Sequence, residues 1–264
     1  EFEYVITLRN STIIINVTDV LAGQNTTINI NVTNGTTGTV YVFINSKMYI
    51  LTLTNSSAQL NLTNLPGGVY PIYATYNGDD RFRTSYNNTS LKVTKLNATL
   101  PIIVRNNILA GETYIVTINA TSNLTGTLTV YLDGKQYTFA RAPAAFTITS
   151  ATAGNHTIRV VYSGDDKYNP ATNNTTYVVG KHKMDLSITA KDIKVGDNET
   201  ITISVPRDAK GIVLLTVNKN QYYINVNETK SMVLSGLAYG KYNVTATYIE
   251  DDMYYPIQQF DAEK

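Results

Sequence analysis

Cysteine and tryptophan are both absent from the 264 residues of the chain. The lack of cysteine excludes a disulfide framework, a thiolate metal site and a cysteine nucleophile. Neither acidic nor basic side chains are in excess, because 21 basic and 20 acidic side chains give a formal net charge of +1. This balance of charge argues against nucleic acid as a partner. No segment approaches the ~18 consecutive apolar residues of a membrane span, so we expect no membrane insertion by this chain.

Residues that favour helices are sparse, whereas Thr, Val, Ile, Asn and the 20 tyrosines are abundant. Apolar and polar residues alternate in many short segments, for example in residues 28–32 and 60–62. A period of two is typical of β-strands with one buried face. The sequence therefore predicts an all-β protein.

An internal repeat determines the number of domains. The segment Tyr-Asn-Gly-Asp-Asp at residues 76–80 has counterparts at 162–166 and 248–252, each 86 residues further along. Three other positions marked by glycine keep the same order through the three copies. Each copy has room for about seven strands, the number and size of an immunoglobulin-like sandwich. We expect three tandem domains that form an elongated rod, with the boundaries 1–95, 96–180 and 181–264.

The first copy carries the pattern Gly-x-Tyr-x₅-Tyr-x-Gly-Asp-Asp at Gly68, Tyr70, Tyr76, Gly78, Asp79 and Asp80. This pattern, followed by a last strand rich in Thr and Asn, resembles the bacterial-type Ig-like repeats of adhesin-like surface proteins in bacteria and methanogenic archaea. The second copy has His156 in place of the first tyrosine, and the third has Glu250 in place of the second glycine. The resemblance covers the whole chain and implies a non-catalytic, extracellular segment of a larger secreted or anchored cell-surface protein.

Two functional hypotheses remain open. In the first, the chain is a stalk or spacer that projects a distal binding domain and takes part in adhesion. In the second, the domains themselves are binding modules for a carbohydrate or protein on another cell, with a site on domain 1. Neither needs a cofactor, and we expect a monomer.

The two ends of the chain depart from the repeat pattern. Residues 3–8 stand, relative to domain 1, where residues 89–93 stand relative to domain 2. Residues 1–10 are therefore either the last strand of a preceding repeat or an extension of the first strand of domain 1. At the other end, residues 260–264 predict a weak, charged last strand.

Few residues have side chains suited to catalysis. The two histidines are the only near-neutral bases, and His156 falls in an inward-facing column, where a structural ring explains it. We therefore expect no enzyme activity. The repeated Asp pairs lie in turns, where carboxylates accept backbone N–H bonds, and one pair supplies too few oxygens for calcium without help from a neighbouring domain. We expect no metal site.

Glycosylation sequons are the most frequent local signal. Eighteen of the 28 asparagines are followed by x-Ser/Thr, against about five expected by chance from the composition. Part of the excess is explained by an Asn-rich composition and by strand alternation. The alternation places Asn25, Asn31 and Asn61 on the outer face of one sheet of domain 1, and Asn119 is the candidate of domain 2.

The outward-facing residues of the third and sixth strands differ between the copies. Only domain 1 is apolar throughout at these positions, with Tyr41, Phe43 and Tyr73. Because these strands are neighbours in an Ig-like sheet, the three rings predict a patch of a few hundred Å² that is a candidate partner-binding surface. The alternative is that the N-terminal segment or a preceding domain covers it.

Overall fold

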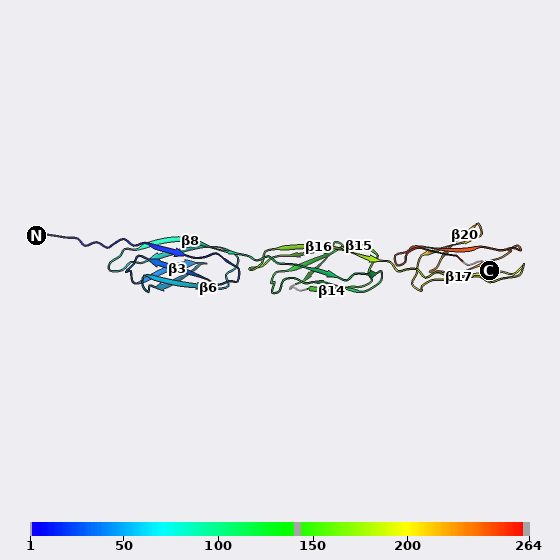
Figure 1. The fold of residues 1–264 in the computed structure, drawn as a ribbon, viewed down its shortest axis with the longest axis horizontal. Coiled ribbons are helices and arrows are strands. Elements are labelled where there is room, and N and C mark those ends of the chain that lie inside the picture. The colour runs from blue at the N-terminus through cyan, green and yellow to red at the C-terminus, as the bar shows by residue number, and fades with distance from the viewer. Residues whose placement is uncertain (1, 140–143, 261–264) are drawn as a thin grey trace.

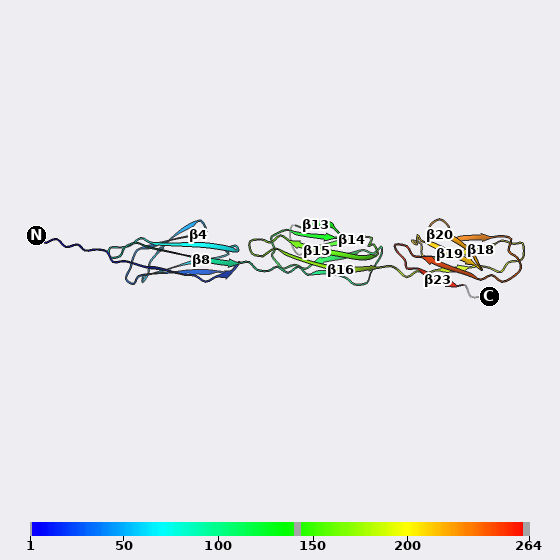
Figure 2. The same ribbon diagram turned by 90° about the horizontal axis from the view of Figure 1, so that it is seen from above.

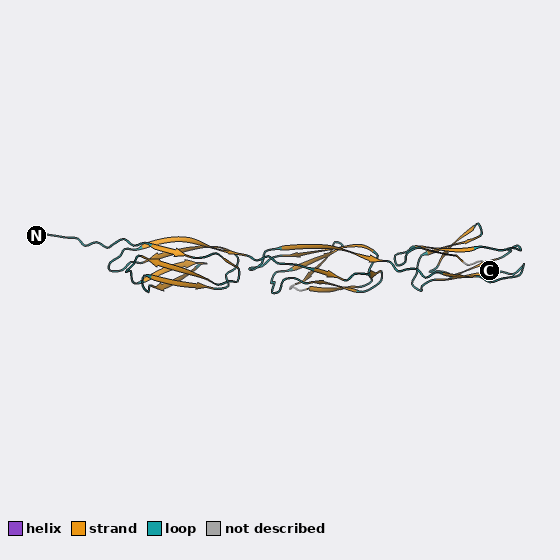
Figure 3. Ribbon diagram, viewed as in Figure 1, coloured by secondary structure: helices purple, strands orange, loops and turns teal. Residues whose placement is uncertain are grey.

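The computed structural model describes residues 2–139 and 144–260 and contains only strands, turns and loops in that part of the chain (Figure 3). Three β-sandwiches follow one another along a single axis, as two perpendicular views show (Figures 1 and 2). Each sandwich has its own hydrophobic core. Within the described ranges no helix is long and apolar enough to cross a membrane. The chain is thus an all-β rod of three tandem immunoglobulin-like domains.

Domain 1 shows the complete topology. Its strands are β1 (Ile13–Asn16), β2 (Val20–Leu21), β3 (Thr26–Val32), β4 (Thr39–Ile44), β5 (Lys47–Thr52), β6 (Ser57–Leu62), β7 (Gly68–Tyr76) and β8 (Ser85–Thr94). One sheet has the order β1-β3-β6, and the other has the order β2-β8-β7-β4-β5. The first strand of the fold is divided, so that β1 joins one sheet and β2 joins the other by a parallel pairing with β8.

Domain 2 repeats this arrangement. Its strands are β9 (Ile102–Val104), β10 (Ile108–Leu109), β11 (Tyr114–Ile118), β12 (Leu128–Leu132), β13 (Lys135–Phe139), β14 (Ala144–Ile148), β15 (Gly154–Tyr162) and β16 (Ala171–Gly180). The sheets are β14-β11-β9 and β10-β16-β15-β12-β13.

Domain 3 departs from the other two at one edge. Its strands are β17 (Ser187–Thr189), β18 (Glu199–Ser204), β19 (Ile212–Val217), β20 (Asn220–Asn225), β21 (Ser231–Leu234), β22 (Val244–Ile249) and β23 (Ile257–Phe260). The sheets are β17-β18-β21 and β20-β19-β22-β23. The stretch 190–198, which corresponds to β2 and β10, forms no strand. The predicted charged last strand lies largely outside the described residues, because these end at residue 260.

The cores follow the alternation of the sequence. In β3, Ile28 and Ile30 are fully buried, whereas Asn29 between them is partly exposed. The second tyrosine of the repeat pattern is fully buried in each domain, at Tyr76, Tyr162 and Tyr248. A tyrosine at the end of this strand therefore belongs to the core of each sandwich.

The junctions between domains are short and bonded. At the first junction the Gly67 N–H donates to the carbonyl of Asp166 at 2.8 Å, and Lys95 Nζ donates to the carbonyl of Asp165. At the second, His182 Nε2 donates to the carbonyl of Ala110 at 2.9 Å. Lys181 Nζ also pairs there with Glu250 Oε2 at 2.9 Å. The residue that departs from the repeat pattern in domain 3 thus contributes a contact at a junction.

The N-terminal segment 2–8 projects from the outer end of domain 1 (Figure 1). Its side chains are exposed, and β1 begins only at Ile13. The segment is bonded to the domain from Leu8 onwards, because the carbonyl of Leu8 accepts a hydrogen bond from Arg83 Nε at 3.3 Å and Arg9 forms a parallel bridge to Phe82. Residues 2–8 form no strand in the structure, and both interpretations of residues 1–10 stay predictions.

Candidate functional site

The three aromatic residues of the candidate patch lie on the outer face of the larger sheet of domain 1. Strand β4 pairs with β7, and Phe43 lies directly opposite Tyr73. The exposed fractions are 38% for Tyr41, 47% for Phe43 and 53% for Tyr73. The N-terminal segment does not cover them, because the side chains of its described residues are themselves exposed. Their role in binding stays a prediction.

Two further apolar residues extend this surface, and the sequence reasoning missed them. Strand β5 places Met48 opposite Phe43 and Ile50 opposite Tyr41, and both side chains are exposed. The signal was present in the sequence, because the turn at residues 45–46 fixes this hairpin register. We call Tyr41, Phe43, Met48, Ile50 and Tyr73 the β4–β5–β7 patch.

The equivalent surface of domain 2 is polar. The guanidinium of Arg159 lies over the ring of Tyr131, with 5.7 Å between Cζ and the ring centroid. The guanidinium makes this face of the sheet polar. It also covers Tyr131, which is the only aromatic ring at the positions equivalent to those of the domain 1 patch. The difference between the domains is therefore one of surface chemistry on a shared scaffold.

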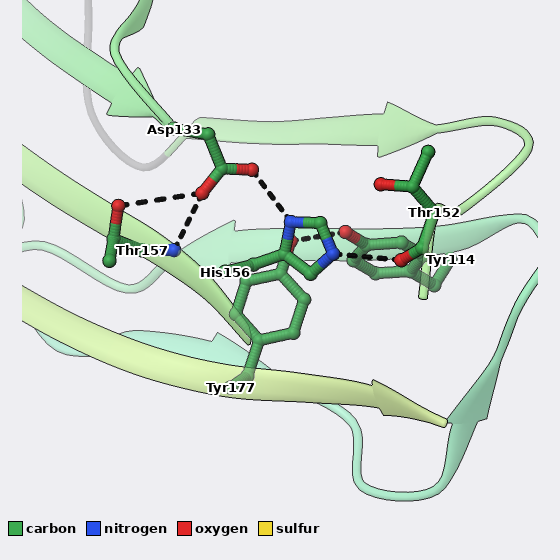
Figure 4. A network of polar contacts seen from close by, with 6 residues as sticks. All are labelled: Tyr114, Asp133, Thr152, His156, Thr157 and Tyr177. Atoms are coloured by element: carbon green, nitrogen blue, oxygen red, sulfur yellow. Dashed lines mark hydrogen bonds and ion pairs between the residues drawn. The ribbon is translucent and has the colours of Figure 1, made fainter. Parts of the chain in front are cut away.

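A polar network surrounds His156 in domain 2 (Figure 4). Nε2 donates to the carbonyl of Thr152 at 2.8 Å, and Nδ1 lies 2.6 Å from Asp133 Oδ2. The imidazole also stacks on Tyr177, with ring centroids 5.2 Å apart, and the hydroxyl of Tyr177 bonds that of Tyr114. The imidazole ring therefore makes two hydrogen bonds, as a structural ring does.

The hydrogen bond from His156 to the carbonyl four residues upstream has an equivalent in domains 1 and 3. The hydroxyl of Tyr70 donates to Pro66 at 2.7 Å, and that of Tyr242 donates to Ala238 at 3.1 Å. This is the geometry of a tyrosine corner, which fastens a strand to the connection that precedes it. His156 performs the same task with a shorter ring.

The pKa values of the pair are shifted in opposite directions. Burial acts to lower the pKa of His156, but the hydrogen bonds to Asp133 and Thr152 raise it above 6.5. Burial acts to raise the pKa of Asp133, but the hydrogen bonds from His156 and Thr157 lower it below 3.8. Each group therefore favours the charged form of the other.

The first aspartate of each repeated pair organises its own turn. Asp79 Oδ1 accepts the N–H groups of Arg81 and Phe82 at 2.8 Å, and Oδ2 accepts the N–H of Thr37 at 2.9 Å. Asp165 and Asp251 make the equivalent bonds. These bonds explain why the residue recurs. Within the described ranges, no cluster of three or more His, Asp or Glu side chains is arranged to hold a metal ion.

The candidate glycosylation sites lie on the surface. Asn25, Asn31, Asn61 and Asn119 are all exposed. Strand β3 pairs with β6, which brings Thr27 opposite Asn61 on the face opposite to the core. Other sequons serve the fold, since the side-chain amides of Asn87 and Asn173 donate to the carbonyls of Ile13 and Leu100 at 2.9 Å. Glycan occupancy at the four exposed sites stays a prediction.

A comparison with known families agrees with the fold of domain 1. Residues 14–94 match the family model of the bacterial Ig-like domain (group 3). No curated protein matches the chain. Bacterial Ig-like domains are generally non-enzymatic, are commonly extracellular and often bind other proteins.

Among solved structures, the fibronectin(III)-like modules of Clostridium thermocellum CbhA are 20% identical to this chain. That match has a TM-score of 0.29 and covers 64% of this chain and 94% of the other. The FN1–FN3 domains of chicken CNTN1 are 8% identical, with a TM-score of 0.29, and cover 95% of this chain and 98% of the other.

Proposed function

Residues 14–94 are a bacterial Ig-like domain of group 3, and from this premise we propose that the chain is the stalk or spacer segment of an adhesin-like cell-surface protein. The observation that carries this proposal is the bonded, end-to-end arrangement of the three domains. We further propose the domain boundaries 1–95, 96–180 and 181–264, an extracellular location, glycans at the exposed sequons and no catalytic role.

A spacer holds its ends apart only if its junctions resist bending. Linkers of one to three residues restrict the angle between domains more than flexible tethers do. The Gly67 N–H donates directly to the carbonyl of Asp166, so the backbones of domains 1 and 2 are in contact, which supports a semi-rigid rod.

Spin labels at equivalent hairpin positions test this rigidity. The chain has no cysteine, so K47C with K135C, and K135C with N220C, place labels without interference. All three positions are exposed and follow the same turn in their domains. We expect one narrow distance distribution for each pair, measured by pulsed electron spin resonance. A broad distribution that spans several tens of ångströms would show flexible beads and contradict the proposal.

A second candidate function is binding through the β4–β5–β7 patch. It is favoured by five exposed apolar side chains on one sheet face of domain 1. The ligand in this hypothesis is a protein or glycan of another cell that covers aromatic rings.

Replacing both Tyr41 and Tyr73 by serine tests this second function. Because both rings are substantially exposed, we expect adhesion of the chain to target cells to be lost while the melting temperature stays within a few degrees of wild type. The matched control is T129S with T157S on the corresponding polar face of domain 2. A fall of many degrees in the melting temperature would show that the rings support the core instead.

A further inference from the structure

Two overlapping sequons lie on β8, beside the aromatic residues of domain 1. Residues 87–90 read Asn-Asn-Thr-Ser, so both Asn87 and Asn88 are followed by x-Ser/Thr. Their side chains belong to opposite faces of the sheet, because Leu91 and Val93 of the same strand are buried and successive residues alternate. Asn87 therefore lies on the inner side of the sheet, and Asn88 lies on the outer side, which carries the β4–β5–β7 patch.

The hydrogen bonds of the two side chains distinguish these asparagines. The side-chain amide of Asn87 donates to the carbonyl of Ile13 at 2.9 Å, and its Oδ1 accepts the N–H of Asn88 at 2.8 Å. Asn87 thus connects β8 to β1 of the other sheet. The side chain of Asn88 is exposed and makes no hydrogen bond to the described residues. Of the two, Asn88 is the one whose amide nitrogen is free to carry a sugar.

Asn88 is the first residue of a row that crosses the outer face of the sheet. It lies directly opposite Tyr73 of β7, and Tyr73 lies opposite Phe43 of β4. Phe43 in turn lies opposite Met48 of β5, and all three apolar side chains are exposed. Because neighbouring strands lie ~4.8 Å apart, the row is about 14 Å long. A sugar chain attached to Asn88 therefore begins at the border of the patch, and each further ring along the row meets another exposed apolar side chain.

The matching row of domain 2 has a cover that contains no sugar. There Asn174 lies opposite Arg159, and Arg159 lies opposite Tyr131. The guanidinium of Arg159 lies over the ring of Tyr131. In domain 1, Tyr73 stands at the position of Arg159, so this row gains a second exposed ring where domain 2 has a cation over its ring. The rings of domain 1 therefore favour a cover that comes from the sequon at the start of their row.

We propose that Asn88 carries an N-linked glycan whose first sugar rings lie across Tyr73 and Phe43 and cover the β4–β5–β7 patch. This inference rests on the glycosylation proposed above for the exposed sequons, and it names the occupied residue and the side chains that the glycan contacts. A pyranose ring has an apolar face of C–H groups, which packs against aromatic rings and removes their apolar area from water. The patch is then accessible to a partner only in copies whose Asn88 is bare.

The attachment is a group transfer from a lipid-linked sugar phosphate, catalysed by a transferase. The bond between the anomeric carbon of the first sugar and the phosphate oxygen breaks, and a bond forms between that carbon and Nδ2 of Asn88. The lipid phosphate leaves with the electron pair of the broken bond, and Nδ2 gives up one proton to a base of the transferase. Nothing is oxidised or reduced, and the side chain of Asn88 keeps one N–H.

Peptide mass spectrometry of the full chain from its native source tests which asparagine is occupied. Tryptic cleavage after Arg83 and Lys92 releases residues 84–92, which contain both asparagines. Fragmentation that preserves the sugar bond should place the sugar on Asn88 and leave Asn87 bare. A sugar on Asn87 instead would overturn the proposal, as would a bare peptide in a chain that carries glycans at other sequons. Absence of sugar from every sequon would overturn the glycosylation of the whole chain together with this inference, whereas the rod tested by spin labels would stand.

The contact between glycan and rings is tested by the reactivity of Tyr73. The variant S90A removes the sequon of Asn88 but keeps the asparagine, and Ser90 is exposed, so the fold should be unaffected. With sugar on Asn88, we expect a nitrating reagent to modify Tyr73 several-fold more slowly in the wild-type chain than in S90A from the same host. Tyr223 of domain 3 is 68% exposed and serves as the internal reference, whose rate should not change. Nuclear Overhauser effects between sugar C–H protons and the ring protons of Tyr73 should accompany the protection.

The matched control is T176A, which removes the sequon of Asn174 in domain 2 in the same way. Because Arg159 covers Tyr131 there, the nitration rate of Tyr131 should be the same in T176A and in the wild-type chain. Equal nitration rates of Tyr73 in the wild-type chain and in S90A, when mass spectrometry shows sugar on Asn88, would overturn the proposal. The glycan would then extend into solvent and leave the rings uncovered.

Discussion

Replacing Tyr162 by alanine should unfold domain 2 and leave domains 1 and 3 folded. Tyr162 is 1% exposed and belongs to the hydrophobic core of domain 2. Truncating a large buried aromatic side chain costs about 3–5 kcal/mol, which is a large share of the stability of a domain of this size. In calorimetry the transition of domain 2 should fall by at least ~12 °C or vanish, since 1 kcal/mol shifts the midpoint of a small domain by about 4–8 °C.

Control variants distinguish the loss of a buried ring from the loss of an exposed ring, and an effect on one domain from an effect on another. Tyr86 lies on β8 and is 82% exposed, so Y86A should leave every transition unchanged. Y76A and Y248A should have the same effect in domains 1 and 3 as Y162A has in domain 2, because each ring is fully buried. If Y162A instead lowers a single transition of the whole chain, the three cores do not fold as separate units.

The fold was predictable from the sequence because the pattern was repeated three times. One strand such as residues 28–32 is a weak signal, but three copies in the same register support one another. The exposed aromatic residues of domain 1 followed from the same alternation. The hairpin partners Met48 and Ile50 were predictable in principle, since a short turn fixes which residues pair.

The polar network around His156 was not predictable in this way. The hydrogen bond between Tyr114 and Tyr177 joins residues 63 positions apart, and only the structure brings them together.

Acidification below pH 4 should destabilise all three domains through the aspartates of the repeated turns. The pKa of Asp79 is lowered below 3.8, chiefly by the hydrogen bond from the N–H of Thr37. For Asp165 and Asp251 burial acts to raise the pKa, but the hydrogen bonds that both accept from backbone N–H groups, and that Asp251 also accepts from the hydroxyl of Tyr248, lower it below 3.8. These three carboxylates should therefore stay charged in the folded domains at a pH where the unfolded chain binds protons.

The direction in which stability changes with pH follows from proton linkage. A carboxylate whose pKa is lower in the folded state contributes stability that is fully present above the unfolded value of 3.8. That contribution is lost as the pH falls through the folded pKa, because the unfolded chain takes up the proton first. The melting temperature should be nearly constant between pH 6 and 5 and should then fall steeply towards pH 2, as measured by circular dichroism.

Alanine variants of the Asp pair in domain 2 test whether the turn aspartates cause the acid sensitivity. D165A leaves the N–H groups of Thr125, Lys167 and Tyr168 without their acceptor, at a cost of about 1–3 kcal/mol. It should lower the transition of domain 2 at pH 6 and make its further fall in acid shallower, because the titrating group is gone. D166A is the matched control, since the hydrogen bond that Asp166 accepts from Gly67 is to its backbone carbonyl and is kept in alanine, so this variant should behave like wild type. Equal effects of the two variants would show that the turn carboxylates are not the source of the acid sensitivity.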